Sequence, residues 1–223
     1  MKLLVLSDTH LDHKYEHEKF RRLENLISES DQVILNGDFW EGYDFTFEDF
    51  LKTPWVKLFP LLKSKKTIYL FGNHDKEIFI DNRIFQFCEL ADHQHITKIA
   101  NTNFIFEHGD KYALKFDGTY HIERPKRIGF VAIELIHKWF VRLFGIRGVW
   151  ILFGQLNNKV KRSIKEEFEH LGNYVFVCGH THCAEVDIEN HFANSGFSKF
   201  GYLQYLTIDD NGKVQKHIET YSR

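Results

Sequence analysis

Three short apolar runs in the first half of the chain have the length and composition of buried β-strands. Each run is rich in Leu, Val, Ile or aromatic residues and gives way abruptly to polar residues. Apolar runs of about four to eight residues, bounded by turn formers, predict strands with both faces covered. The runs lie within residues 2–8, 31–38 and 66–73.

Two helical segments separate these strands. Residues 15–30 place four apolar side chains on one face of an amphipathic helix: Phe20, Leu23, Leu26 and Ile27. Residues 47–65 also have a helical pattern, but Pro54 and Pro60 interrupt it. Strands that alternate with helices predict an α/β protein with a largely parallel, doubly wound arrangement.

The second half of the chain contains more strand and one long helical stretch. Residues 102–110 and 173–182 predict further strands, and residues 191–219 predict a hairpin or meander that turns at Asp-Asp-Asn-Gly. Between these segments, residues 118–171 differ in composition and predict a helical insertion. Because no repeat or Ser/Gly-rich linker interrupts the chain, we expect one domain spanning residues 1–223.

Composition narrows the class of protein. The chain has 223 residues with 29 Lys and Arg against 31 Asp and Glu, and a net charge of −2 predicts no general affinity for polyanions. Three cysteines without a Cys-x-x-Cys pair favour a reducing compartment. The sequence shows neither a signal peptide nor an apolar stretch of the ~20 residues that span a membrane. We therefore expect a cytoplasmic protein.

Polar residues follow five of the predicted strands at the point where each strand ends. In α/β sheets, ligands bind outside the carboxyl ends of the strands. Any one of these segments could be an ordinary turn, but together they predict a single cluster of Asp, Asn and His side chains. The five segments are Asp8-Thr9-His10, Gly37-Asp38, Gly72-Asn73-His74-Asp75, His108-Gly109-Asp110 and Gly179-His180-Thr181-His182.

This mixture of side chains suits two divalent metal ions. Asp8 and His10 are two positions apart, as are His180 and His182, so one turn can present both side chains of each pair. The Asp38 carboxylate has two oxygens and can bridge two metals. Histidine, carboxylate and amide ligands favour manganese, iron, zinc or cobalt over calcium and magnesium, and we expect manganese. Two metals ~4 Å apart can clamp a phosphate and generate a bridging hydroxide for in-line attack.

In their order, these blocks resemble the calcineurin-like metallophosphoesterases. That superfamily carries Asp-x-His, Gly-Asp, Gly-Asn-His-Asp/Glu, a lone His and Gly-His-x-His, and all five blocks stand here between residues 8 and 182. The Asn-Ser-Gly at residues 194–196 is similar to a turn that often follows them. The resemblance implies a two-sheet α/β sandwich with flanking helices, and a metal-dependent hydrolase of phosphoester or diphosphate bonds.

The resemblance also implies a role for each residue of the blocks. His74 would bind no metal but would stand beside the phosphate as general acid or charge stabiliser, with Asp75 fixing its orientation. Histidines outside the blocks, such as His137, are expected on the surface or in the core. The metals would share Asp38, with Asp8, His10 and His182 holding one ion and Asn73, His108 and His180 holding the other.

The predicted helical insertion is the segment that gives information about the kind of substrate. Residues 128–144 form an apolar helix with one narrow polar line, and after a glycine-bounded turn the chain becomes basic over residues 157–165. Between His121 and Lys165 there are ten Lys or Arg and two Glu. Two interpretations stay open: a helical hairpin packed on the core, or a lid that binds acyl chains or a membrane interface.

Within the superfamily, this insertion resembles the helical lid of the UDP-2,3-diacylglucosamine pyrophosphatases, which accommodates acyl chains. The Gly-Asp-Phe-Trp-Glu at residues 37–41 is also similar to a block of that group. A lipid-nucleotide substrate would bring the insertion to the inner face of the membrane. The candidate substrate-binding residues are Asp117, Tyr120, Lys161, Arg162 and Lys165.

His74 is the residue at which the chain departs from that group, which usually has Arg there. Histidine can protonate a leaving alkoxide and arginine cannot, so His74 favours general phosphoesterases. A phosphodiesterase or phosphatase acting on nucleotides, nucleic acid or phosphoprotein is therefore the alternative, although no dedicated nucleic-acid module is present. A catalytically silent scaffold is disfavoured because every ligand block is filled.

Overall fold

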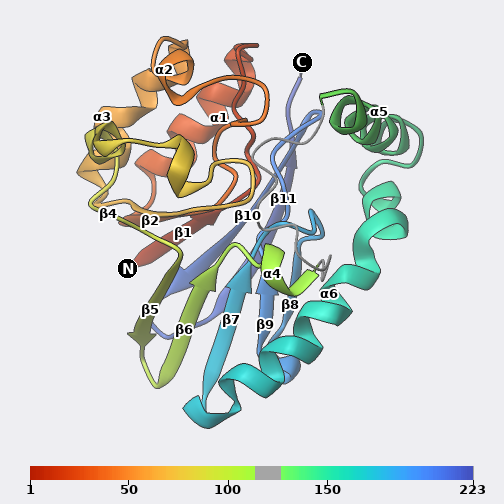
Figure 1. Ribbon diagram of the computed structural model, residues 1–223. Coiled ribbons are helices and arrows are strands. Elements are labelled where there is room, and N and C mark those ends of the chain that lie inside the picture. Colours follow the sequence, from red (N-terminus) through yellow and green to blue (C-terminus); the bar gives the residue numbers. More distant parts are fainter. Residues whose placement is uncertain (114–126, 223) are drawn as a thin grey trace.

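The computed structural model arranges the strands in two sheets that pack face to face, with helices on the outside (Figure 1). It describes residues 1–113 and 127–222, and within the second range the side chains from residue 135 onward. The predicted two-sheet α/β sandwich is confirmed. The strands of the first half are parallel, as the strand–helix alternation predicted, and they form part of one of the two sheets.

The first sheet has a parallel centre and an antiparallel edge. Strands β1 to β4 pair in parallel, β10 pairs antiparallel with β1, and β11 pairs antiparallel with β10. The predicted meander at the end of the chain therefore supplies this edge. In order across the sheet, the strands are β11 (Val214–Thr220), β10 (Tyr202–Asp209), β1 (Lys2–Leu6), β2 (Gln32–Asn36), β3 (Ile68–Leu70) and β4 (Leu90–Asp92).

The second sheet places two further motif-bearing strands side by side. Its central strands β6, β7 and β9 are parallel, and β5 and β8 pair antiparallel at its edges. In order, the strands are β5 (Gln94–Ile99), β6 (Thr102–Glu107), β7 (Tyr174–Cys178), β9 (Phe192–Asn194) and β8 (Glu185–Asp187).

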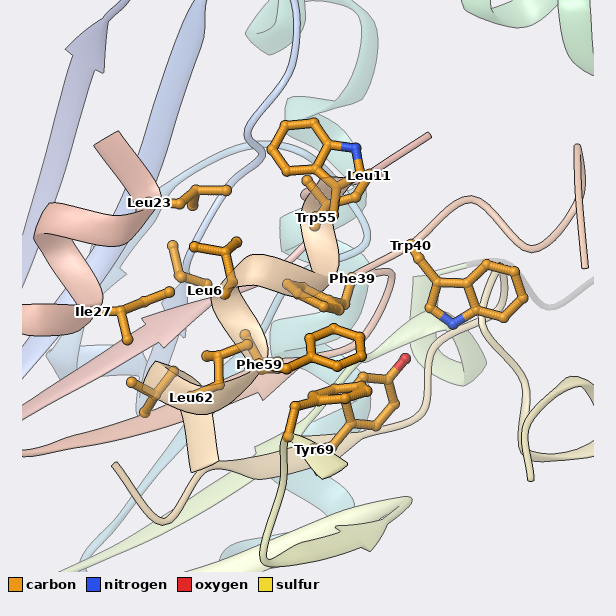
Figure 2. Packing of buried hydrophobic residues seen from close by; sticks show 14 of the residues in the cluster. Leu6, Leu11, Leu23, Ile27, Phe39, Trp40, Trp55, Phe59, Leu62 and Tyr69 are labelled. Atoms are coloured by element: carbon orange, nitrogen blue, oxygen red, sulfur yellow. The ribbon is translucent and has the colours of Figure 1, made fainter. Parts of the chain in front are cut away.

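The side chains of β1 alternate between the two faces of the first sheet, and both faces are packed. Leu3 and Val5 pack between the sheets, and Leu4 and Leu6 pack against the helices of the first layer. Figure 2 shows Leu6 among side chains of α1 and α3, including Leu23. Each fully buried aliphatic side chain contributes about 1.5–3 kcal/mol of transfer free energy, so both faces of this strand stabilise the fold.

The helices follow the predicted pattern, with the breaks that proline imposes. Pro54 and Pro60 each occupy a first-turn position, so the segment predicted over residues 47–65 divides into α2, a 3-10 turn and α3. The main helices are α1 (His17–Ser28), α2 (Phe47–Phe50), α3 (Phe59–Ser64), α4 (Asp110–Ala113), α5 (Arg127–Phe144) and α6 (Ile146–Phe168). Short 3-10 turns lie at Pro54–Leu58, Glu77–Phe79, Asn82–Gln86, Glu169–Leu171 and Ile188–Asn190.

The insertion is a helical hairpin whose two arms have different surroundings. Gly145, with φ of 59°, is the one residue between α5 and α6, so the turn is tighter than the glycine-bounded turn predicted after residue 144. The later part of α6 packs on the outer face of the second sheet through Val160, Ile164 and Phe168 (Figure 1). In the described parts of the chain, no helix combines the length and apolarity that a membrane span requires.

Candidate metal centre

The loops after β1, β2, β3, β6 and β7 meet at the carboxyl ends of the two sheets. Backbone hydrogen bonds join these loops: Asp8 N–H donates to Gly37 at 3.1 Å, and His10 N–H donates to Asp38 at 2.9 Å. The loops after β6 and β7, both in the second sheet, are linked in the same way, because Gly179 N–H donates to the His108 carbonyl at 3.1 Å. Residues far apart in sequence are thus held together by main chain.

Backbone strain is concentrated in these loops. Nine non-glycine residues in the described part of the chain have positive φ, a region that L-residues rarely adopt. Five of the nine are predicted metal ligands, with φ between 43° and 62°. Such strain persists only where surrounding contacts impose it, and it marks functional sites. The five are Asp8, His10, Asp38, His180 and His182.

One half of the cluster is built around Asp8. Its Oδ1 lies 3.1 Å from His182 Nε2 and 3.8 Å from His10 Nε2. The other carboxylate oxygen, Oδ2, accepts the His180 backbone N–H at 2.9 Å and so fixes the orientation of the group. Ligand atoms of Asp8, His10 and His182 lie within 4.8 Å of one another, as the ligands of one ion must.

The other half is built around Asn73. Its amide oxygen lies 3.1 Å from His108 Nε2 and 2.8 Å from His180 Nδ1. Asp38 Oδ2 lies 3.3 Å from His108 Nε2 and 3.9 Å from His10 Nε2, between the two halves of the cluster. All seven predicted ligands therefore come together, and Asp38 has the intermediate place expected of a shared ligand.

The pKa shifts of His10 and Asp8 favour the forms that bind a divalent cation, a neutral imidazole and an ionised carboxylate. Burial, together with the nearby His74, lowers the pKa of His10 to about 4, and its Nε2 is buried without a hydrogen-bond partner among the described residues. Burial would raise the pKa of Asp8, but the hydrogen bond and charge of His182 lower it to about 2. His108 Nδ1–H donates to the Asn36 carbonyl at 3.0 Å, which leaves Nε2 as the metal-facing nitrogen. The residues therefore fit a bound metal.

Glu41 is a buried carboxylate that the ligand prediction did not include. Its Oε2 lies 3.0 Å from His10 Nδ1, and its Oε1 lies 2.6 Å from His74 Nδ1. His10, His74 and Glu41 are all buried. A carboxylate on the far nitrogen of a metal-binding histidine fixes its tautomer and raises its basicity. Glu41 thus orients the rings of both His10 and His74.

Asp75 has a different position from the predicted one. We expected it to fix the orientation of His74, but Glu41 holds the Nδ1 of that ring. The Asp75 carboxylate instead accepts backbone N–H groups of Gly72, Asp38 and Phe39, at 2.7–2.9 Å, and the hydroxyl of Tyr69. Asp75 therefore holds the loop that carries the ligands.

Two further residues that no motif identified reach the cluster. The His137 ring, from α5, stacks on His182 with centroids 5.1 Å apart, although we expected only a surface or core role. Lys199 Nζ, from the loop before β10, lies 3.8 Å from Glu41 Oε2. A lone histidine in an apolar helix and a lysine beyond the last motif carry no sequence signal of their own.

The five predicted substrate-binding residues fall into three groups. Asp117 and Tyr120 lie outside the described residues. The Lys161 ammonium is 2.5 Å from carboxylates of Glu185 and Asp187, so this lysine ties α6 to β8 and the prediction of a phosphate contact is wrong. Arg162 and Lys165 lie on the exposed side of α6, where their substrate role stays a prediction.

Two solved structures are similar to the chain over nearly its whole length, at low sequence identity. The Vps29 protein of Entamoeba histolytica, solved with Zn²⁺, has 13% identity and a TM-score of 0.49, with 99% of each chain covered. The phosphoesterase YfcE of E. coli has 16% identity and a TM-score of 0.48, with 97% of this chain and 98% of YfcE covered. At these values the similarity supports no conclusion about this chain.

A family comparison is more specific. No curated protein matches the chain, but the family model described as calcineurin-like phosphoesterase matches residues 1–184. The match covers every ligand block from Asp8 to His182. The chain therefore belongs to the calcineurin-like phosphoesterase family.

Proposed function

We propose that this protein is a hydrolase of phosphoester or diphosphate bonds that uses two divalent ions, most simply Mn²⁺, with Fe and Zn as alternatives. The observation that carries the proposal is the convergence of seven Asp, Asn and His side chains from five loops, with Asp38 between the two halves. When bound, such ions activate water and neutralise phosphate charge.

His74 is suited to give a proton to the leaving group. Its Nδ1 is held by Glu41, and its Nε2 faces the ligand cluster, 3.9 Å from Asp38 Oδ2. Burial alone would lower the pKa of His74, but the charges of Asp38 and Glu41 outweigh burial and raise it above the ordinary value. A protonated imidazole beside the scissile bond can act as general acid.

The substrate we favour is a lipid-linked phosphate, such as a lipid nucleotide like UDP-2,3-diacylglucosamine. The outer side of the insertion exposes seven large apolar side chains, which is unusual for a helix in contact with water only. Exposed cations adjoin them, and the sequence has no acidic residue from 135 to 165. The apolar set, which we term the α5–α6 patch, comprises Leu135, Ile136, Trp139, Leu143, Phe144, Trp150 and Ile151.

This patch would meet the acyl chains of a substrate or the bilayer that carries them. Trp139 and Trp150 have the amphipathic rings that favour a membrane interface, and Lys138, Arg142 and Arg147 would attract anionic lipid. A soluble nucleotide or phosphoprotein would make no use of this surface, so the observation favours the lipid substrate over the general phosphatase.

The reaction class is tested by turnover. Metal-free protein, reloaded with manganese, iron, zinc or cobalt, is offered UDP-2,3-diacylglucosamine, a nucleotide and aryl phosphate mono- and diesters. We expect hydrolysis that EDTA abolishes and added metal restores. If none of the metals supports hydrolysis of any of these esters, the proposed activity is wrong.

The lipid preference is tested on the α5–α6 patch. Trp139→Ser with Leu143→Ser should lower turnover of the acylated substrate at least ~10-fold relative to an aryl phosphodiester, since two large apolar contacts are lost. Ile188→Ser removes an exposed apolar side chain outside the patch and is the control. An unchanged ratio of the two substrates would contradict the lipid assignment.

A further inference from the structure

Asn157 is a buried polar residue in the middle of α6, the second arm of the insertion hairpin. Its Nδ2 donates to the Cys183 carbonyl at 3.0 Å and to Glu185 Oε2 at 2.7 Å. Its Oδ1 accepts the Thr181 hydroxyl at 2.5 Å and Asn194 Nδ2 at 3.3 Å. The amide therefore uses both of its N–H donors and both acceptor positions of its oxygen. A fully satisfied buried network of this kind holds its members in one arrangement.

Thr181 is the residue that connects this network to the metal centre. Its hydroxyl accepts Asn194 Nδ2 at 3.0 Å, so its one proton is directed to Asn157 Oδ1. Thr181 lies between His180 and His182, whose φ angles of 62° and 60° are in the left-handed region. Strained conformations of this kind persist only where surrounding contacts impose them. Asn157 supplies one such contact, from a helix that carries none of the predicted ligands.

The two histidines beside Thr181 belong to different halves of the centre. His180 Nδ1 lies 2.8 Å from Asn73 Oδ1, and His182 Nε2 lies 3.1 Å from Asp8 Oδ1. A change in the orientation of the Thr181 backbone would therefore move one ligand of each half. Distances between a metal and its ligands tolerate deviations of only about 0.2 Å, so such a movement would weaken the binding of both ions.

Anchoring of α6 does not by itself explain an amide at this position. One turn later, Lys161 ties the same helix to Glu185 and Asp187 at 2.5 Å, and apolar side chains of α6 pack on the second sheet. An apolar side chain at residue 157 could pack there as well, without the cost of desolvating an amide. What the amide adds is an acceptor for the Thr181 hydroxyl.

We propose that Asn157 is a positioning residue of the metal centre, which acts through Thr181 to hold His180 and His182 in the conformation that binds two ions. The insertion then supports the ligands from its inner side, in addition to the substrate contact proposed for its outer side. This inference rests on the metal centre of the proposed function and assigns to the insertion a role beyond substrate binding.

The test compares Asn157→Leu, Thr181→Val and the double variant with the wild type, all first freed of metal. Calorimetric titration measures the Mn²⁺ affinity, and the visible absorption bands of the Co²⁺-loaded proteins report the ligand geometry. Each single substitution should shift the Co²⁺ bands and weaken Mn²⁺ binding ~10- to 100-fold, as loss of a contact behind a metal ligand does. Because both substitutions remove the same hydrogen bond, the double variant should bind little more weakly than the weaker single variant. Fully additive losses would overturn the proposed connection through Thr181.

Lys161→Met is the matched control, because it removes another polar contact between α6 and Glu185 without affecting Thr181. Its Mn²⁺ affinity and Co²⁺ bands should equal those of the wild type, and an equal loss there would overturn the proposal in favour of helix anchoring. If Asn157→Leu does not fold, Thr181→Val keeps the contacts of α6 with Cys183 and Glu185 and gives the same comparison. Wild-type Mn²⁺ affinity in either folded variant overturns the role of Asn157. Weakened affinity in the variants, beside a wild-type protein that binds metal but hydrolyses no phosphate ester, upholds that role and overturns the proposed function.

Discussion

At the scale of single residues, Glu41 links the two kinds of histidine in the site. One of its oxygens meets His10, a metal-ligand candidate, and the other meets His74, the proposed acid. The contact arises because the segment ending in Glu41 runs beside the one after β1, with Glu41 N–H donating to Leu11 at 3.0 Å. The sequence placed Glu41 three residues after Asp38 but offered no sign of its partner.

We predict that Glu41→Gln weakens divalent-metal binding and turnover together. Glutamine keeps the shape but removes the charge that holds the two imidazoles, and loss of a carboxylate behind a metal ligand costs about 10- to 100-fold in affinity. Metal titration and kcat on an aryl phosphodiester provide the measurement. Glu219→Gln removes a carboxylate that contacts Tyr205 at the sheet edge, and it should change neither quantity. Wild-type metal affinity in Glu41→Gln would show that the carboxylate does not support the ligands.

At the scale of elements, α1 contacts the loop after β1, which carries the ligand candidates Asp8 and His10, through Lys19. Lys19 is 1% exposed, and its Nζ donates at 2.5 Å to the carbonyl of Thr9, which lies between two ligands. Burial lowers the pKa of Lys19 to about 8. The unfolded chain keeps a pKa near 10.5, so between pH 8 and 10.5 the unfolded state binds more protons and stability rises with pH.

Lys19→Met should reveal this pH dependence. The methionine side chain does not titrate, so the difference in free energy of unfolding, wild type minus variant, should increase from pH 7 to pH 10. Urea unfolding of the metal-free proteins at the two pH values measures it. A difference that stays constant or decreases would mean that the ammonium is not desolvated in the folded state.

His137 packs the insertion hairpin against the metal centre, beside the contacts that Val141 and Val149 make with Cys183 and Phe197. The His137 ring is 5% exposed and contacts His182, Phe197 and Phe200, with centroids 5.0–5.3 Å apart. Its Nε2 has no hydrogen-bond partner in the described structure. An unsatisfied buried nitrogen costs free energy, whereas the ring itself fills an aromatic cluster.

We therefore expect opposite effects from two substitutions of His137. His137→Ala should lower the free energy of unfolding by about 1–3 kcal/mol because it leaves a cavity. His137→Phe should be neutral or stabilising because it keeps the ring and removes the unpaired nitrogen. Thermal unfolding is the measurement, with exposed His170→Ala as the control. A phenylalanine variant as unstable as the alanine variant would show that the nitrogen has a stabilising partner.

The strands and helices that the sequence predicted are those with the clearest pattern of apolar residues. The apolar runs of β1, β2 and β7 are fully covered by both layers, which is why they read as buried strands. The strands β4, β5 and β8 were not predicted, because they are short or lie at sheet edges, where residues such as Leu90 and Asp92 are exposed and no continuous apolar run forms. The basic stretch at 157–165 was misread because Lys161 finds its carboxylate partners only in the fold.

At the scale of the whole molecule, the site exists because two sheets end at the same place. Residues from Asp8 to Asp75 come from the first sheet, and those from His108 to His182 come from the second. The position of the five blocks at strand ends predicted a single cluster, and the resemblance to a known superfamily implied which of its residues are ligands. Lys199 and His137 could not be predicted in this way, because their place depends on how a loop and a helix pack across that junction.

The central claim is that these seven side chains hold two metal ions with Asp38 shared between them. Calorimetric titration of metal-free protein with Mn²⁺, for the wild type and for Asp38→Ala, tests it most directly. We predict two ions per wild-type chain, and at most one, weakly bound, in the variant, with turnover lost. An Asp38→Ala protein that binds two ions and keeps full activity would contradict the account, as would a wild-type chain that binds none.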